Sequence, residues 1–402
     1  MKILVSCYAC SPYKGSEPGM GWNFVRQMAL NHELHIMVES KFRKDLEQYF
    51  DLHPEERANK HFYFIARQRN KLLRKIWPPS YYWFYRKWQK KAYRKAVELD
   101  KALNFDLVHQ LNMVGYREPG YLWKMDRPLV WGPIGGFNIT PWNMLASMGL
   151  KGCVFYFSRN MMNLWQMHTG RRVKKAMRRA NALIAATQNE ANFILKLYGR
   201  ESTVIPEVGF SGKEIKFIPH DRCKALKICW CGQFTPGKSL NLLIEAASFV
   251  TSDVELHVLG DGACAGKWKR MAWGMPNLHI NWYGWVERAK GMTIMQECDV
   301  FCITSLSDLT STVLLEALSY GLPVIALDHC GFTNVIIDEC GIKIPIQRKE
   351  QVVKDIAKAI DGIAADEKRR KRMSVAAYQR SLSYGWEEKG KQIDGIYKKV
   401  LE

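Results

Sequence analysis

Apolar runs with strand character alternate with helical patterns along most of the chain, and this alternation constrains the fold more than any other feature. Strands that alternate with helices are typical of βαβ units and a parallel sheet. The sequence therefore predicts an α/β fold with two doubly wound, Rossmann-like domains. The first series of runs is KILVSCY, ELHIMVE, DLVHQ, PLVWGP, ALIAAT and STVIP, and the second is LKICWCG, VELHVLG, LHINWYG, DVFCIT and PVIAL.

The alternation stops at residues 206–224, which are rich in proline, glycine and charge and are typical of a linker. This break divides the chain into an N-terminal domain, 1–205, and a C-terminal domain, 225–385, each long enough to bury a core. Residues 386–402 form a further predicted helix. Its apolar stripe comprises Trp386, Ile393, Ile396, Tyr397 and Val400.

Composition favours a cytoplasmic protein. No run of 18 or more apolar residues predicts a membrane span. The apolar start of the chain is too short for a signal peptide and is typical of a first buried strand. Eleven cysteines in 402 residues indicate reduced thiols and not a disulfide framework.

The net charge of +20 lies almost wholly before residue 206. The stretch from Arg57 to Val97 holds many basic residues and no acid, with tryptophan and tyrosine side chains between them. If Ser80 caps a helix, one apolar stripe follows at helical spacing. That stripe comprises Tyr81, Tyr85, Trp88, Ala92, Ala96 and Leu99.

Three interpretations of this stretch remain open. A basic helix with aromatic residues suits an anionic membrane surface, and we favour this reading. It also suits single-stranded nucleic acid. No nucleic-acid-binding motif accompanies it, however, so we expect that the protein does not bind nucleic acid. The third interpretation is a core stripe whose opposite face is a solvated basic surface. A second basic cluster, at residues 171–179, supports a basic face.

Two acids, Asp308 and Glu316, stand eight positions apart around Ser311 and Thr312, which are typical of a helix start. A helix start offers backbone N–H groups to a phosphate. The set therefore suits a nucleotide-sugar, with one carboxylate on the ribose diol and one on the sugar hydroxyls. The plainer alternative is a buried helix whose acids cap and solvate its ends.

The chain resembles the retaining glycosyltransferases of family 4, which carry a Glu-x7-Glu signature. Here the signature is Asp308-x7-Glu316, and further motifs follow in the family's order. The resemblance implies the GT-B architecture, in which the two domains face each other across a cleft and the last helix crosses back to the first domain. The motifs are MKILVSCYACSPYKGSEPGMGWN, CGQFTPGKSLNLLIEA, HVLGDG, INWYGWV, GLPVIALDHCGFTNVI and SYGWEEKGKQIDGIYKKV.

The resemblance also implies roles for residues of the C-terminal domain. Lys238 corresponds to the family's lysine at the donor diphosphate, and Val286 lies in the segment that meets the nucleobase. Gln233 stands where an arginine is common, so one cation is missing at the leaving group. We assign Glu316 to the ribose diol and Asp308 to the sugar.

In the N-terminal domain the resemblance places Gly15 in a loop that contacts the donor, and it places Ser16 and Glu17 on the acceptor side. The family's usual histidine is absent from LVWGPIGGFN, and His109 is the nearest candidate, although a structural role is the commoner one for such a histidine. The chain contains no Asp-x-Asp, which predicts catalysis without a metal or other cofactor.

These features predict a retaining glycosyltransferase that moves a sugar from a nucleoside-diphosphate-sugar to a lipid-linked glycan at the inner face of the cytoplasmic membrane, in bacterial surface-polysaccharide synthesis. Two alternatives stay open. One is a GT-B epimerase that acts on a nucleotide-sugar. The other is a catalytically weak member that serves as a binding partner in a polysaccharide-assembly complex.

Overall fold

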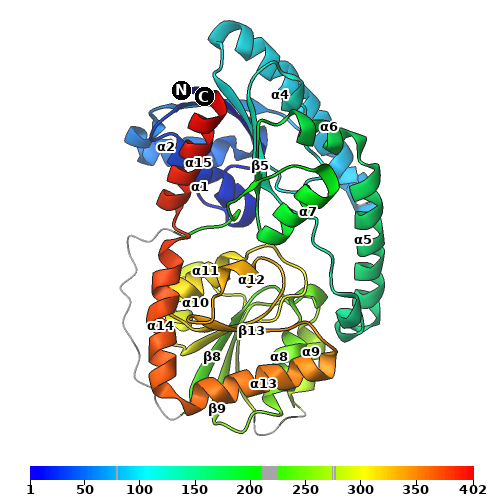
Figure 1. The fold of residues 1–402 in the computed structure, drawn as a ribbon, viewed down its shortest axis with the longest axis vertical. Coiled ribbons are helices and arrows are strands. Elements are labelled where there is room, and N and C mark those ends of the chain that lie inside the picture. Colours follow the sequence, from blue (N-terminus) through cyan, green and yellow to red (C-terminus); the bar gives the residue numbers. More distant parts are fainter. Residues whose placement is uncertain (78–79, 211–224, 274, 276–277) are drawn as a thin grey trace. The chain divides into compact units, whose positions relative to one another are not determined.

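The structure is a computed structural model that describes residues 1–77, 80–210, 225–273, 275 and 278–402. It divides into two compact units (Figure 1). The first unit comprises Met1–Phe137, Gln166–Val208 and Trp386–Glu402, and the second comprises Asn138–Trp165 and Gly209–Gly385. The sequence had placed residues 138–165 in the N-terminal domain. Most of the predicted linker, 211–224, lies outside the described residues.

The first unit is built on a seven-stranded parallel sheet of order β3-β2-β1-β4-β5-β6-β7. Its strands are β1 (Lys2–Cys7), β2 (Glu33–Glu39), β3 (Lys60–Ile65), β4 (Leu107–Asn112), β5 (Leu129–Ile134), β6 (Ala182–Ala185) and β7 (Thr203–Val204). Its helices are α1 (Ser16–Met28), α2 (Arg43–Leu52), α3 (Lys71–Ile76), α4 (Ser80–Leu103), α6 (Arg171–Arg179), α7 (Gln188–Tyr198) and α15 (Trp386–Leu401).

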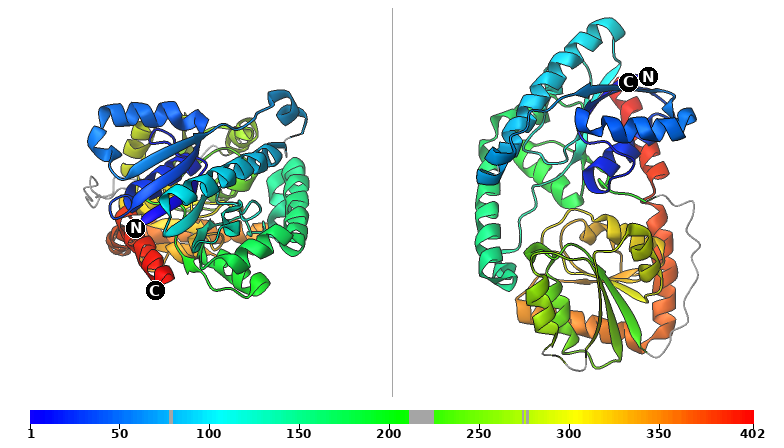
Figure 2. Two further views of the ribbon diagram at one scale, coloured as in Figure 1. Left: turned by 90° about the horizontal axis from the view of Figure 1, so that it is seen from above. Right: turned by 180° about the vertical axis from the view of Figure 1, so that it is seen from behind.

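The second unit repeats this plan with a six-stranded parallel sheet of order β10-β9-β8-β11-β12-β13 (Figure 2). Its strands are β8 (Leu226–Cys231), β9 (Val254–Leu259), β10 (His279–Gly284), β11 (Val300–Ile303), β12 (Val324–Leu327) and β13 (Gly341–Ile344). Its helices are α8 (Leu240–Ala247), α9 (Ala265–Trp273), α10 (Arg288–Gln296), α11 (Thr312–Ser319), α12 (Phe332–Val335), α13 (Lys349–Ala365) and α14 (Glu367–Leu382), and most of α5 (Gly149–Thr169) belongs to it.

Both sheets have the strand order of a doubly wound dinucleotide-binding fold, which confirms the predicted fold class. The strands are nearly continuous apolar runs because helices cover both faces of a parallel sheet. In the second unit, α8, α9 and α13 share one apolar core with the sheet. No helix among the described residues is long and apolar enough to cross a membrane.

The C-terminal helix α15 returns to the first unit, as predicted. It packs on α1, where the rings of Phe24 and Trp386 meet edge to face with centroids 5.2 Å apart. Ile393 and Tyr397 of its predicted apolar stripe are fully buried. The inner face of α15 therefore belongs to the core of the first unit.

Helix α4 begins at Ser80, as predicted, and most of its apolar stripe is core. Tyr85, Trp88, Ala92 and Ala96 are buried, whereas the basic side chains on the other positions are largely exposed. The rings of Tyr85 and Trp88 both pack edge to face against Tyr8, which directly follows β1. These buried aromatic residues are therefore not available to a membrane, and the exposed part of the predicted contact consists of the basic side chains together with Trp77, Tyr82 and Trp83.

Candidate functional site

The strand order of the second unit places a ligand site between β8 and β11. The chain runs outward on one side from β8 and on the other side from β11, so the loops after these two strands diverge. Ligands of open α/β sheets bind beyond the carboxyl ends of the strands at this switch point. The loop after β8 carries Lys238, and the loop after β11 carries Asp308.

The side chains of Lys238 and Asp308 form an ion pair that joins these two loops. Backbone contacts hold the loops together beneath it. The Leu306 N–H donates to the Gly237 carbonyl at 2.8 Å, and the Thr304 hydroxyl donates to the Lys238 carbonyl at 2.9 Å. Both members of the ion pair are mostly buried but reach solvent, so an incoming ligand can compete for either charge.

The loop after β11 leads directly into α11, as the sequence predicted. Ser311 precedes the helix with a φ of 70°, a value that favours glycine, and Thr312 is its first residue. The first N–H groups of an α-helix have no partner within the helix. Within the described part of the chain, Ser311 forms no capping side-chain hydrogen bond. This start of α11 is therefore suited to an anion.

Glu316 lies on the buried side of α11, four residues after its start; the sequence had placed it at the opening of the helix. Its carboxylate pairs with the guanidinium of Arg288, the first residue of α10. Burial raises the pKa of Glu316, and the charge and hydrogen bond of Arg288 oppose this shift. The sequence analysis missed Arg288, because nothing in the local pattern marks an exposed arginine at a helix start.

Cys231 links the two halves of this site, since both Glu316 and Lys238 act on it electrostatically. It ends β8, and burial raises the pKa of its thiol to about 11. The charge of Glu316 also raises this pKa, whereas Lys238 lowers it. The carboxylate of Glu316 and the ammonium of Lys238 thus lie around the same strand end.

Two further predicted residues border this region. Gln233 is exposed in the loop after β8. Val286 is half-buried between β10 and α10, next to the largely exposed indole of Trp285. The structure therefore brings together Lys238, Asp308, Ser311, Thr312 and Glu316 at the carboxyl ends of β8 and β11, and it places Gln233 and Val286 in the loops after β8 and β10.

Helix α5 adds residues that the sequence analysis missed. The Arg159 guanidinium donates a hydrogen bond to the hydroxyl of Ser307, the residue before Asp308. The Tyr156 hydroxyl lies so close to Gly237 that a Cβ there would be 2.2 Å from it, so only glycine fits next to Lys238. Arg159 therefore places a positive charge beside the loop of Asp308, whereas the loop after β8 carries the uncharged Gln233.

The predicted residues of the N-terminal domain lie in the first unit, around the start of α1. Gly15 precedes the helix, and Ser16 has a positive φ of 56°. The Glu17 carboxylate accepts a hydrogen bond from the Val114 N–H at 2.7 Å, and desolvation raises its pKa.

The structure gives His109 a place in the core and offers no support for the predicted catalytic role. Its ring is fully buried, and its Nε2–H donates to the Gly132 carbonyl at 2.8 Å. Its Nδ1 then accepts from the Tyr397 hydroxyl of α15 at 2.5 Å. Burial lowers the pKa of His109 to about 4, so the ring is neutral. Both ring nitrogens of His109 form hydrogen bonds inside the core. His109 therefore connects the C-terminal helix α15 to β5, and neither nitrogen can contact a substrate.

One group of possible metal ligands occurs among the described residues, in the first unit. It comprises Glu33 and His35 of β2 and His61 of β3. The Glu33 Oε1 lies 3.1 Å from the His35 Nε2 and 3.4 Å from the His61 Nε2. None of these residues belongs to the site around Lys238 and Glu316.

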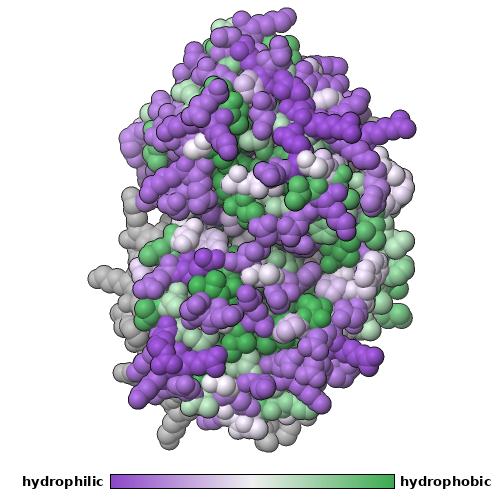
Figure 3. Space-filling model, viewed as in Figure 1, coloured by the Kyte–Doolittle hydropathy of each residue, from purple (hydrophilic) through white to green (hydrophobic). Residues whose placement is uncertain are grey.

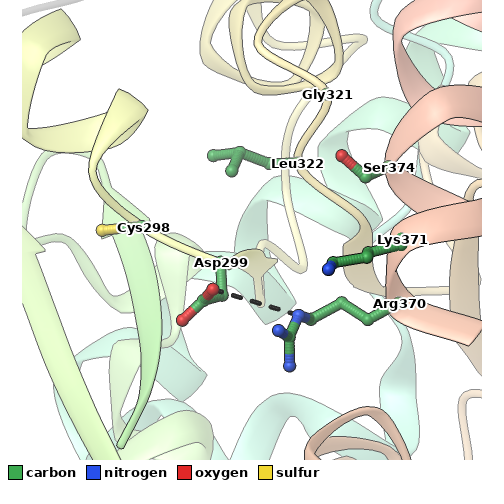
Figure 4. A pocket seen from close by; sticks show the side chains of 7 residues that line it. All are labelled: Cys298, Asp299, Gly321, Leu322, Arg370, Lys371 and Ser374. Atoms are coloured by element: carbon green, nitrogen blue, oxygen red, sulfur yellow. Dashed lines mark ion pairs between the residues drawn. The ribbon is translucent and has the colours of Figure 1, made fainter. Parts of the chain in front are cut away.

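A small pocket of the second unit lies at the amino ends of the strands, at the end of the sheet opposite the candidate site (Figure 4). Asp299, which directly precedes β11, faces the buried Arg370 of α14 across it at 3.9 Å. This pair attaches α14 to the amino ends of the strands, away from the switch point. The pocket is lined by Cys298, Asp299, Gly321, Leu322, Arg370, Lys371 and Ser374.

Comparison with known families identifies the part of the chain that carries the site. The family described as glycosyl transferases group 1 matches residues 213–380, which include Lys238, Asp308 and Glu316. Residues 213–380 are thus similar to this family, and the match covers less than half of the chain.

Known proteins resemble the chain over part of its length. A D-inositol 3-phosphate glycosyltransferase of Kribbella flavida is 26% identical over 252 residues, which is 56% of this chain and 57% of that protein. A phosphatidyl-myo-inositol mannosyltransferase of Mycobacterium leprae is 28% identical over 170 residues, 41% of this chain and 44% of that protein. The chain thus spans about half the length of the curated relatives that it matches.

Solved structures resemble the whole chain and show its fold. HepE of Anabaena in complex with UDP and glucose superposes with a TM-score of 0.66 at 17% identity, covering 99% of this chain and 100% of that one. The apo form of the lipopolysaccharide outer core galactosyltransferase WaaB gives a TM-score of 0.68 at 16% identity, over 99% and 100% of the two chains. At this identity the likeness establishes the architecture alone.

Proposed function

We propose that the protein is a retaining glycosyltransferase that uses a nucleoside-diphosphate-sugar donor. The observation that carries the proposal is the ion pair of Lys238 and Asp308 at the switch point, beside the start of α11 and the buried Glu316. A cation, a helix start and two carboxylates match the diphosphate, the ribose and the sugar of such a donor. The match of residues 213–380 to the glycosyl transferase group 1 family and the names of the relatives support this reading.

The ion pairs of the free protein suggest how the donor is received. The diphosphate attracts the Lys238 ammonium, and this exchange releases the Asp308 carboxylate for the hydroxyls of the transferred sugar. Glu316 accepts hydrogen bonds from the ribose diol, with Arg288 holding the carboxylate in place. Trp285 and Val286 border the position for the nucleobase.

Arg159 supplies the second cation at the leaving group. Gln233 has no charge, but the Arg159 guanidinium lies against Ser307 in the loop that carries Asp308. A guanidinium binds phosphate oxygens in a bidentate manner, which an amide does not. Charge that develops on the departing diphosphate is then stabilised by Lys238, Arg159 and the start of α11.

The proposed chemical step uses no protein nucleophile. The protein orients the donor and the acceptor and stabilises the departing diphosphate. The bond between the anomeric carbon and the phosphate oxygen breaks, and the acceptor oxygen forms the new bond on the same face. The acceptor proton passes to the departing phosphate oxygen. Fixed charges at the diphosphate make this step independent of a metal.

The acceptor is a lipid-linked glycan, and the setting is surface-polysaccharide synthesis at the cytoplasmic face of the membrane. The charge of the N-terminal half supports this part of the proposal, because each Lys or Arg near an anionic bilayer contributes about 1 kcal/mol. At the start of α1, Gly15 is proposed to contact the donor, and Ser16 and Glu17 are proposed to contact the acceptor.

Two experiments test the proposal. Thermal unfolding in the presence of UDP-, GDP-, dTDP- and ADP-sugars identifies the donor, because a ligand that binds the folded state raises the midpoint. Release of the nucleoside diphosphate from that donor then distinguishes an enzyme from a protein that only binds. An epimerase would change the sugar without releasing the nucleotide.

A further inference from the structure

Helix α5 exposes a row of large apolar side chains, whereas a surface helix usually turns its polar face to solvent. Its inward side mixes polar and apolar residues, and the buried positions are Gly152, Tyr156, Asn160, Asn163 and Met167. The Asn160 side chain is satisfied there, since it accepts from the Thr140 N–H at 3.0 Å and donates to the Thr140 carbonyl at 2.8 Å. These contacts within its own unit fix the orientation of α5. The helix therefore cannot rotate about its axis to bury the exposed apolar side chains.

The outward positions form a continuous apolar face. Its long row follows the helical spacing i, i+4, i+7, i+11 and i+15, and a second row lies alongside. These side chains are between 51% and 83% exposed. We define the outer face of α5 as Leu150, Val154, Phe155, Phe157, Met161, Met162 and Trp165.

The indole of Trp142 extends this face. Its ring meets that of Phe157 edge to face at 5.6 Å, although both rings remain about half exposed. The row from Leu150 to Trp165 is about 22 Å long at 1.5 Å per residue. Apolar side chains gather along the right-hand edge of Figure 3, over the position of α5 in Figure 1. A monomeric protein surface rarely exposes so many large apolar residues together.

The charge around α5 in the sequence selects the partner. The helix has no acidic residue, and none occurs anywhere from Arg127 to Gln188, a stretch that includes the basic helix α6. An apolar face with tryptophan and phenylalanine, in a segment with only positive charge, is typical of a helix that lies in the interface of an anionic bilayer. A protein partner of this surface would instead find no acid with which to pair a lysine or arginine.

We propose that the outer face of α5 inserts into the surface of an anionic lipid bilayer. The helix lies in the interface plane, with its apolar rows below the headgroups and its buried side against the second unit. The inner side of the same helix carries Tyr156 and Arg159 to the loops around Lys238. One element thus contacts both the bilayer and the candidate donor site. The docking itself does not rest on the proposed activity.

Flotation with vesicles tests the proposal without any sugar donor. Wild-type protein is incubated with vesicles of phosphatidylcholine alone or with 30% phosphatidylglycerol, together with the variant Phe155→Gln/Met162→Gln/Trp165→Gln. The matched control is Leu52→Gln/Leu195→Gln/Leu382→Gln, three exposed leucines on α2, α7 and α14. Thermal midpoints establish that all three proteins are folded.

We expect the wild type and the control to float with the anionic vesicles, and the α5 variant to bind at least tenfold more weakly. Equal binding by the α5 variant and the wild type would overturn the proposal, as would a wild type that does not bind. A wild type that forms dimers without lipid, while the α5 variant stays monomeric, would also overturn it and would assign the face to a second copy of the chain. None of these outcomes depends on whether the protein transfers sugars.

Discussion

The Lys238 ammonium and the Asp308 carboxylate form an ion pair that joins the two loops at the switch point of the second sheet. In the free protein each charge is therefore satisfied by the other. A donor that binds here must replace this pair, and the diphosphate is the group that can take Lys238. The roles of the two residues follow from that exchange and can be separated by substitution.

Lys238→Ala should lower kcat by about a hundredfold or more, because the lysine stabilises the leaving diphosphate in the transition state. In this variant the Asp308 carboxylate has no cationic partner. Its charge should therefore repel the diphosphate of the donor and raise KM. Lys238→Arg keeps the charge and should recover part of the rate. Steady-state kinetics measure both variants, and an alanine variant with wild-type kcat would remove Lys238 from the chemistry.

Glu316→Gln should weaken binding of the nucleoside diphosphate by about ten- to a hundredfold, since a hydrogen bond to a charged group contributes about 1.5–3 kcal/mol. Asp308→Asn should spare nucleotide binding and impair sugar transfer. Titration calorimetry measures the nucleotide affinities. Glu297→Gln, at an exposed glutamate just after α10, is the control for lost charge. Equal loss of nucleotide affinity in the Glu316 and Asp308 variants would contradict this division of roles.

Arg159→Ala should lower kcat by about tenfold or more if its guanidinium replaces the charge that Gln233 lacks. Arg159→Lys should restore part of the rate, because it restores the charge without the bidentate geometry. Lys151→Ala, at an exposed lysine of the same helix, should leave kcat unchanged. If Arg159→Ala behaves like Lys151→Ala, the second cation lies elsewhere.

Activity should survive an excess of chelator. The prediction rests on the missing Asp-x-Asp and on the fixed charges at the diphosphate. Glu33, His35 and His61 lie in the first unit. A metal bound by these residues should change the thermal stability of the protein and should leave its turnover rate largely unchanged. Loss of activity with EDTA, restored by magnesium or manganese, would show that the reaction needs a metal.

Stability should fall when the pH drops from about 6.5 to about 4. His109 is buried with a pKa of about 4, whereas an unfolded histidine titrates near 6.5, so the unfolded state binds more protons within this window. The free energy of unfolding should lose up to about 3 kcal/mol from this group alone. Denaturant unfolding at several pH values measures the slope, and His109→Gln should reduce it. An equal slope in both proteins would assign the acid sensitivity to other groups.

Much of the C-terminal domain could be predicted because its signals are local. Each predicted strand of that domain is a short apolar run, and Ser311 and Thr312 mark the start of α11 directly. β3 and β13 were missed: β3 begins KHF, with two charged or polar residues in its first three, and β13 has the sequence GIKI, in which a glycine and a lysine alternate with the isoleucines.

The remaining features depend on tertiary contacts that no local pattern encodes. Arg159 is separated by 148 positions from Ser307, which it contacts, and Tyr397 by 288 positions from His109. The apolar residues of α5 have ordinary helical spacing, so the sequence alone does not reveal that they face outward. The basic stretch at α4 shows the converse, because its aromatic stripe was compatible with both a surface and a core and proved to be core.

The central claim is that a nucleoside-diphosphate-sugar binds at Lys238, Asp308 and Glu316. The most direct test is the thermal midpoint of the wild type and of Lys238→Ala/Glu316→Gln, each with the UDP-, GDP-, dTDP- and ADP-sugars at saturating concentration. We predict that one donor class raises the midpoint of the wild type and leaves that of the variant unchanged. A donor that stabilises both proteins equally, or four donors that stabilise neither, would contradict the claim.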